Sequence, residues 1–226
     1  MSLPSAPVAL VADDDEFFRL ALTAILNRIG FAEVIETGSF DAALDQLAQR
    51  GSAVTLALFD LAMPGMDGPV SLSAVRECFP AVKVAVVSAS STRARILEAL
   101  EVGVHGYVPK GLGAHELTRA IGTILDGQVF VPAILATPDP TPGRAAGAET
   151  RVAPGRTLDA ARGPDLTPRQ RDVLALLVEG KSNKEIARDL NLGEGTVKVH
   201  MAALLRSLGV QNRAAAAVAG ARLLAG

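Results

Sequence analysis

The sequence contains no tryptophan and only one cysteine, Cys78. A single thiol excludes a disulfide within the chain, and sparing use of cysteine suits a reducing compartment. Cys78 falls in an expected helix before Pro80, where we expect a small buried side chain rather than a reactive thiol. No apolar run approaches the roughly 18 residues that span a bilayer, and the opening MSLPSAPVAL lacks the features of a secretory signal. We therefore expect a cytoplasmic protein without a membrane partner.

The composition allows a substantial core but divides the charge unevenly. The chain has 226 residues, enough for two domains, and 49% of them are hydrophobic. Residues 1–140 carry 16 Asp or Glu against 9 Lys or Arg, whereas residues 163–226 carry 6 against 9. An acidic part joined to a mildly basic part suggests two tasks, and a polyanion is a candidate partner of the basic part.

The first part of the chain alternates short apolar runs with amphipathic helical segments. Continuous Val, Ala and Leu runs of this kind are typical of strands buried on both faces. The expected strands are residues 8–12, 33–37, 54–59, 82–88 and 105–109. Five such β/α units predict a doubly wound α/β domain with a parallel sheet, (βα)5, over residues 1–135. Its functional crevice is expected at the carboxyl ends of the strands.

The remaining chain divides into a linker and a small helical domain. Residues 136–164 are rich in Pro, Gly, Ala, Arg and Thr and nearly free of large apolar side chains, which indicates a flexible linker. Residues 165–226 predict an all-α domain of four short helices, two of which open with a capping box (Thr167 with Gln170, Ser182 with Glu185). Two short helices joined by a tight turn, the second amphipathic, form a helix-turn-helix pattern.

Reactive residue types follow four of the expected strands. Asp13 and Asp14 follow the first strand, Asp60 the third, Ser88 ends the fourth and Lys110 follows the fifth. Each acid could simply be a loop residue, but parallel strands bring all these side chains to one edge. Three carboxylates supply the hard oxygen ligands that Mg²⁺ prefers, with open positions for a phosphate. The next acid in the DDD run, Asp15, is expected to cap the following helix instead.

These motifs resemble the receiver domain of bacterial response regulators. The resemblance is carried by DDD after the first strand, DLAMPGMDG after the third, the serine after the fourth and GYVPK after the fifth. With the C-terminal segment, the chain resembles the NarL/FixJ subfamily, in which a receiver precedes a LuxR-type helix-turn-helix. The resemblance implies that Asp60 is the phosphoacceptor. It also implies that Asp13, Asp14, Asp60 and the backbone carbonyl of Ala62 bind Mg²⁺.

The same resemblance assigns three further receiver residues. Lys110 takes the position of the lysine that neutralises phosphoryl charge, and Ser88 that of the switch hydroxyl. Tyr107 takes the aromatic position whose rotamer follows activation, although a partly buried strand residue is the plain alternative. The implied donor of the phosphoryl group is a sensor histidine kinase.

The sequence GTVKVHMAALLRSL has the pattern of a recognition helix. On a helical wheel one stripe is apolar and predicts the core face: Val197, Met201, Leu204 and Leu208. The opposite face combines two basic side chains with small residues, as a helix in a DNA major groove requires: Gly195, Lys198, Val199, Ala202 and Arg206. A purely solvated face is the alternative, but it would usually carry acids as well.

Family positions refine the expected DNA contacts. By resemblance, Lys198 and Val199 read bases, and Thr196 and His200 lie near phosphates. Lys181 and Lys184 flank the first helix of the motif and could contact phosphate. Gly193 replaces the usual Ser or Thr at the N-cap of this helix. Ala202 stands where some relatives have a basic base-reading residue, so an operator preference does not carry over.

The expected function is a phosphorylation-dependent DNA-binding transcription regulator of a two-component system, not a turnover enzyme. An orphan regulator that binds DNA without phosphorylation stays open as an alternative. A Mg²⁺-dependent phosphatase with Asp60 as nucleophile is disfavoured, because its acid/base position two residues later is Ala62. The expected partners are a histidine kinase, paired half-sites on double-stranded DNA and a second copy of the chain. The last helix, residues 214–224, could form the dimer surface or simply pack within the domain.

Overall fold

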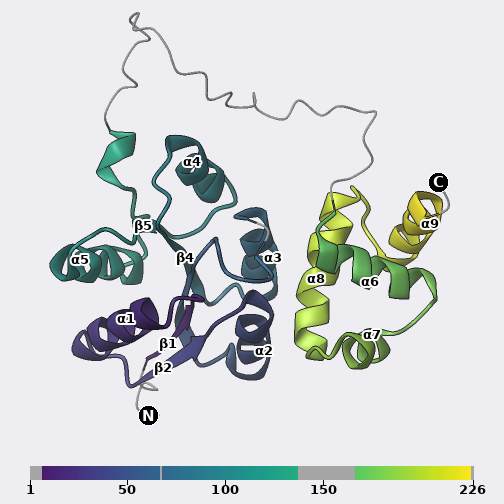
Figure 1. The fold of residues 1–226 in the computed structure, drawn as a ribbon, viewed down its shortest axis with the longest axis horizontal. Coiled ribbons are helices and arrows are strands. Elements are labelled where there is room, and N and C mark those ends of the chain that lie inside the picture. The colour runs from purple at the N-terminus through teal and green to yellow at the C-terminus, as the bar shows by residue number, and fades with distance from the viewer. Residues whose placement is uncertain (1–6, 67, 137–165, 225–226) are drawn as a thin grey trace, which may run out of the picture.

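The N-terminal part is a five-stranded parallel sheet with helices on both faces (Figure 1). The structure is a computed structural model that describes residues 7–66, 68–136 and 166–224. The strands occur in the order β2-β1-β3-β4-β5, all parallel. Their bounds are β1 Val8–Ala12, β2 Glu33–Thr37, β3 Val54–Phe59, β4 Lys83–Ser88 and β5 Tyr107–Pro109. The strand order reverses between β1 and β3, so the carboxyl ends of these two strands form the topological switch point at which doubly wound sheets usually bind ligands.

Five helices cover the sheet as a doubly wound fold requires. Their bounds are α1 Glu16–Arg28, α2 Phe40–Arg50, α3 Val70–Cys78, α4 Arg93–Glu101 and α5 Ala114–Leu125. Side chains of α2, α3 and α4 share one apolar cluster with the sheet, and those of α1 and α5 share the other. The predicted (βα)5 fold is confirmed.

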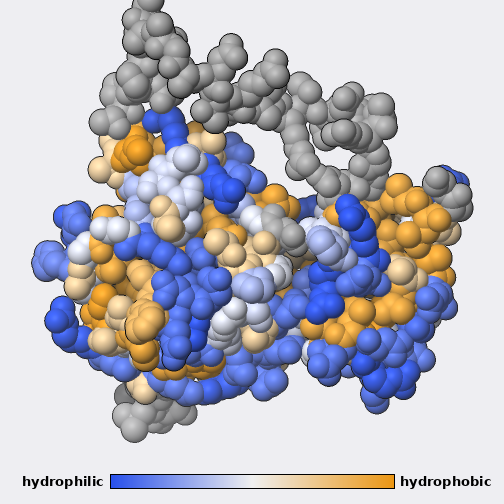
Figure 2. Space-filling model, viewed as in Figure 1, coloured by the Kyte–Doolittle hydropathy of each residue, from blue (hydrophilic) through white to orange (hydrophobic). Residues whose placement is uncertain are grey.

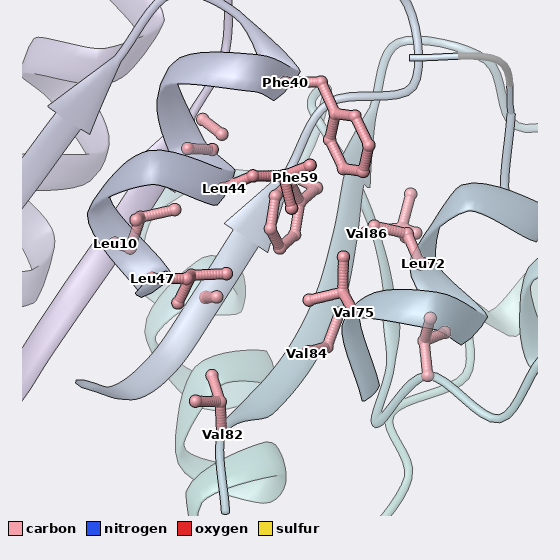
Figure 3. Close-up of a cluster of buried hydrophobic side chains, with 14 of the residues drawn as sticks. Leu10, Phe40, Leu44, Leu47, Phe59, Leu72, Val75, Val82, Val84 and Val86 are labelled. Atoms are coloured by element: carbon pink, nitrogen blue, oxygen red, sulfur yellow. The ribbon is translucent and has the colours of Figure 1, made fainter. Parts of the chain in front are cut away.

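The larger of these clusters is built around the central strands. In Figure 3, Phe40, Leu44 and Leu47 of α2 point toward Phe59 of β3. The rings of Phe40 and Phe59 meet edge to face, with centroids 5.9 Å apart. Every residue of β1 is buried, which explains why its sequence is a continuous apolar run rather than an alternating one.

Two local expectations are wrong. The fifth strand is shorter than the expected 105–109, because Gly106 pairs only as an isolated bridge with Phe130. Cys78 is exposed rather than buried, since it is the last residue of α3 and lies outside the apolar cluster. The predicted linker, residues 136–164, lies outside the described residues except for Ala136.

The C-terminal part consists of helices with a separate core. Their bounds are α6 Pro168–Val178, α7 Asn183–Leu190, α8 Glu194–Ser207 and α9 Arg213–Leu224. Both predicted capping boxes form, at Thr167 with Gln170 and at Ser182 with Glu185. Asn191, with φ of +52°, ends α7 in the left-handed region that a tight turn into α8 requires. Within the described residues, no helix is both long and apolar enough to cross a membrane.

Leu44→Ala should destabilise the sheet domain by about 2–5 kcal/mol, because it removes a fully buried side chain that its neighbours only partly replace. Urea denaturation followed by circular dichroism measures the change. The control Leu97→Ala removes a side chain of α4 that is 42% exposed, and it should cost much less. Equal losses for the two variants would contradict this description of the core.

Candidate functional site

Three acids meet at the carboxyl edge of the sheet. Asp13 and Asp14 follow β1 and Asp60 follows β3, and the Asp60 amide donates to the carbonyl of Ala12 at 2.8 Å. One carboxylate oxygen from each acid lies within 4.8 Å of the others. Asp13 and Asp60 are buried, whereas Asp14 is exposed at the mouth of the site. The structure thus brings the predicted acidic cluster together.

Lys110 supplies the positive charge of this cluster. Its Nζ lies 2.7 and 2.9 Å from the two carboxylate oxygens of Asp13 and 3.4 Å from Asp60 Oδ2. It also lies 4.9 Å from the ring centroid of Phe18, a cation–π distance. One cation therefore contacts two buried carboxylates that repel each other.

Burial and charge act in opposite directions on these groups. Burial raises the pKa of Asp60 above its ordinary value, with Asp13 adding to the rise and Lys110 opposing it. Burial would lower the pKa of Lys110, but its contacts with Asp13 and Asp60 raise it overall. The lysine therefore stays charged and partly offsets the effect of burial on Asp60.

The donor set suits a hard divalent cation. Asp13 Oδ2 is buried and, although 2.7 Å from Lys110 Nζ, accepts no well-aligned hydrogen bond within the described residues. Three convergent carboxylates, one of them exposed at the entrance, match the oxygen ligands and partial hydration of Mg²⁺. The Ala62 backbone hydrogen-bonds the Asp60 carboxylate, and its carbonyl as a further ligand stays a prediction.

Ser88 and Tyr107 lie behind this pocket on neighbouring strands. Ser88 is buried, and its Oγ accepts a hydrogen bond from the Ser90 amide at 3.2 Å. Tyr107 is completely buried, and its hydroxyl donates to the carbonyl of Ser90. Both side chains therefore hydrogen-bond to the backbone of Ser90, in the short segment after β4.

Asp15 has the capping role that the sequence predicts. Its side chain accepts from the amides of Phe17 and Phe18 at the start of α1. The DDD run therefore divides into two residues of the acidic cluster and one helix cap.

The second candidate site is the face of α8. Its predicted core stripe packs inside the C-terminal domain, with Val197, Met201 and Leu204 buried and Leu208 partly buried. The opposite face lies against α2 and α3 of the sheet domain (Figure 1). Val199 and Ala203 even join the apolar cluster of that domain. Much of the predicted DNA-binding face is therefore covered in this arrangement, whereas Lys198 stays exposed.

Polar contacts accompany this packing. Asp45 of α2 accepts from the Gly193 amide at 3.0 Å and from the Thr196 hydroxyl. At the other end of the face, Arg206 donates to Ser73 Oγ at 2.6 Å and pairs with Glu77.

Asp41, one turn before Asp45, binds two further groups. Its Oδ2 accepts from Arg169 Nη2 at 2.7 Å, and its Oδ1 lies 2.9 Å from His200 Nε2. Burial alone would raise the pKa of Asp41, but these two partners hold it below its ordinary value. Asp41 therefore remains a carboxylate that clamps α6 and α8 to the sheet domain.

The predicted DNA-contact residues fall into two groups. Lys184 and Lys198 are exposed, and Arg206 is exposed although paired. Thr196, Val199 and His200 are buried against the sheet domain, with Ala202 partly buried beside them. Sequence reasoning missed Asp41, Asp45 and Arg169. One sequence feature pointed toward the Asp45 contact, namely the glycine at position 193, where Ser or Thr is usual. A Cβ at this position would overlap the Asp45 carboxylate.

The outer surface of α9 is apolar. Figure 2 shows hydrophobic residues gathered over this helix, and the exposed ones include Val218, Leu223 and Leu224. The inner side packs through Ala216 and Gly220, so α9 both completes the domain core and presents apolar side chains outward.

Comparison with known proteins gives two family matches. Residues 9–122 match the response regulator receiver domain, and residues 164–219 match the bacterial regulatory proteins of the luxR family. The chain is 36% identical to the glycerol metabolism activator of Pseudomonas putida, with 90% of each chain covered. It is 31% identical to the nitrate/nitrite response regulator protein NarL of Escherichia coli K12, with 96% of each covered. A structure of the Salmonella typhimurium RcsB response regulator shares the fold, with a TM-score of 0.55, 22% identity and 98% of each chain covered.

Lys110→Met should raise the pKa of Asp60 further, because it removes the cation that opposes burial and the charge of Asp13. Carboxyl NMR titration in magnesium-free buffer measures this pKa in both proteins. We expect the wild-type value to lie above that of an ordinary aspartate. The control Lys83→Met removes a lysine at the opposite edge of the sheet. An Asp60 pKa that is unchanged by Lys110→Met would contradict the contact.

Proposed function

Because the chain belongs to the NarL/FixJ-type response regulators, DNA-binding transcription regulators of two-component systems, we propose that Asp60 receives a phosphoryl group that controls binding of DNA by α8. The cluster of Asp13, Asp14, Asp60 and Lys110 carries this proposal, because it combines a buried nucleophile with a neutralising cation.

The proposed reaction transfers a phosphoryl group from a histidine kinase. A carboxylate oxygen of Asp60 attacks phosphorus as the P–N bond to the kinase imidazole breaks, which gives an acyl phosphate and a free imidazole. Asp13, Asp14 and Asp60 would hold Mg²⁺, which neutralises charge on the transferring group when bound. Lys110 contributes a second positive charge from its place between Asp13 and Asp60. Catalysis in such a site is chiefly positioning and electrostatics.

The phosphoryl group of the product carries about −1.5 to −2 charge in place of the single charge of the Asp60 carboxylate, and it lies beside the buried Asp13. Ser88, at the end of β4, can turn its hydroxyl to donate to a phosphoryl oxygen, and this reorientation would break the hydrogen bond that Ser88 Oγ accepts from the Ser90 amide. Tyr107 is tied to the same residue through the Ser90 carbonyl. Ser88 and Tyr107 are thus proposed as the switch pair.

A second connection leads from Asp60 toward the DNA-binding helix. The segment after Asp60 includes Pro64, whose carbonyl accepts from the Phe40 amide at 2.9 Å. Phe40 begins α2, and the next residue is Asp41, which binds Arg169 and His200. Rearrangement of this segment on phosphorylation would therefore loosen the contact between the two parts of the chain.

DNA binding requires that α8 leave the sheet domain, since Thr196, Val199 and His200 are buried against it. Once α8 is free, we propose that Lys198 and Val199 read bases, with Thr196, His200, Arg206 and Lys184 near phosphates. The docked arrangement also favours phosphorylation control over the orphan alternative, because α8 as described here cannot enter a groove.

The proposed division of the chain is a receiver over residues 1–135, a linker over 136–164 and a DNA-binding domain over 165–226. The apolar outer surface of α9 suits a dimer contact, so two copies would bind paired half-sites.

The proposed phosphoryl chemistry is that of an acceptor rather than of an enzyme with a separate substrate, because Ala62 offers no acid or base beside Asp60.

Incubation with acetyl phosphate and Mg²⁺ should add one phosphoryl group, because Asp60 is a nucleophile beside Lys110 and a cation site. Intact mass spectrometry measures the gain. Asp60→Asn or chelation of Mg²⁺ should abolish it, whereas Asp126→Asn, an exposed acid at the end of α5, should not. The same gain in Asp60→Asn would refute Asp60 as the acceptor.

Lys198→Ala should weaken binding of the phosphorylated chain to its selected operator by about 1–3 kcal/mol if the lysine reads a base. In vitro selection from random duplexes identifies the operator, and fluorescence anisotropy measures affinity. Arg119→Ala, an exposed arginine of α5, is the control. Equal affinities for Lys198→Ala and wild type would remove Lys198 from the interface.

A further inference from the structure

Helix α2 presents two carboxylates, one turn apart, to four hydrogen-bond donors of the C-terminal domain. Asp45 accepts from the Gly193 amide and the Thr196 hydroxyl. Asp41 accepts from Arg169 and lies 2.9 Å from His200 Nε2. A carboxylate only accepts hydrogen bonds, so Nε2 carries the hydrogen of this pair. All four contacts therefore join a donor of the C-terminal domain to an anionic oxygen of the receiver.

The donors are of the kinds that bind phosphates in proteins. The Gly193 amide lies at the positive end of the 14-residue helix α8, and no side chain of that helix caps it. A guanidinium, an imidazole and a hydroxyl complete the set. Thr196 and His200 are at least nine-tenths buried beneath α2, so the carboxylates satisfy groups that would otherwise be costly to bury.

Two glycines let the anions approach this closely. A Cβ at Gly193 would overlap the Asp45 carboxylate, and one at Gly195 would overlap the Cβ of Ala48 in α2. The usual Ser or Thr at the Gly193 position would cap α8 from within and compete for its amides. With glycine there, the helix N-terminus is open to an anion from outside.

We propose that Arg169, the Gly193 amide, Thr196 and His200 form one binding site for phosphates of the DNA backbone, and that Asp41 and Asp45 occupy it in place of two phosphates. The proposal adds Arg169, which lies on α6 outside the helix-turn-helix, to the DNA interface. It makes inhibition competitive, because a receiver carboxylate and a DNA phosphate cannot share the same donors.

This proposal rests on the proposed function, since it requires α8 to bind DNA once released. It goes beyond simple covering of α8, in which the receiver blocks this helix by packing against it and occupies no phosphate-binding group. Under simple covering, Arg169 acts solely as a tie between the two parts, and its removal should release the DNA-binding face. If Arg169 instead belongs to a shared site, its removal should weaken DNA binding wherever Asp41 no longer competes.

The experiment measures binding of the unphosphorylated full chain to a labelled random-sequence duplex over a series of salt concentrations. Phosphate contacts are independent of sequence, so no operator is needed. Asp41→Asn/Asp45→Asn should bind about tenfold more tightly than wild type, because two charge-assisted contacts are lost while side-chain shape is kept. Asp41→Asn alone should have a smaller effect in the same direction, and Asp126→Asn should have none.

The decisive step introduces Arg169→Ala into the Asp41→Asn/Asp45→Asn background. We expect weaker duplex binding and a salt slope lower by about one, as for the loss of one phosphate contact. In the same background, Arg169→Lys should retain part of the duplex affinity and part of the salt slope that Arg169→Ala loses. The control Arg171→Ala removes an exposed arginine two residues along α6, on a different side of the helix, and should change neither.

The outcomes separate the two proposals. If no variant binds the duplex even at low salt, DNA binding by this chain fails, and the shared site fails with it. If the variants bind but Arg169→Ala leaves affinity and salt slope unchanged in the double-asparagine background, the shared site is overturned and DNA binding stands. Tighter binding on Arg169→Ala in that background would likewise identify Arg169 as a tie only.

Discussion

The proposed chemistry of this protein depends on two buried carboxylates, Asp13 and Asp60, that share one lysine, Lys110. Asp13 and Asp60 follow the neighbouring strands β1 and β3, so the parallel sheet forces like charges together where water is scarce. Lys110 relieves part of that repulsion through contacts of 2.7 Å to Asp13 and 3.4 Å to Asp60. The balance leaves Asp60 with a raised pKa and a local need for positive charge. A pocket with that need accepts a divalent cation readily and responds strongly to a phosphoryl group.

The route from this pocket to the DNA-binding face is short because α2 serves both. Its apolar side, with Phe40 and Leu44, packs on β3 next to Asp60 (Figure 3). Its polar side carries Asp41 and Asp45, which bind α6 and the N-terminal half of α8. The Phe40 amide is fixed to the carbonyl of Pro64, in the segment that follows Asp60. Under the proposed function, a change at Asp60 would reach Asp41 through this backbone hydrogen bond and the start of α2.

The parts of the fold that follow from local pattern could be predicted from the sequence. The run VALVA predicts a doubly buried strand, and β1 is buried throughout. Acids after strands 1 and 3 could be placed together, because parallel topology alone brings them to one edge. Asp41 and Asp45 could not be found in this way, since they lie on an ordinary amphipathic helix and their partners are more than 120 residues away. The exposure of Cys78 could not be predicted for a related reason, because the position of a residue at a helix end does not determine whether its side chain is buried.

The face of α8 shows why one sequence pattern can have two structural meanings. Small residues and basic side chains predict a surface that fits closely against a polyanion, and the structure places that surface against two carboxylates of α2 and one of α3. Val199 and Ala203 add apolar contact with the receiver core, which DNA could match only with thymine methyl groups. In the proposed competition, the receiver therefore offers α8 the same kinds of contact as DNA. Because the competing contacts are similar in kind, we expect a small displacement of α2 to change which partner α8 binds.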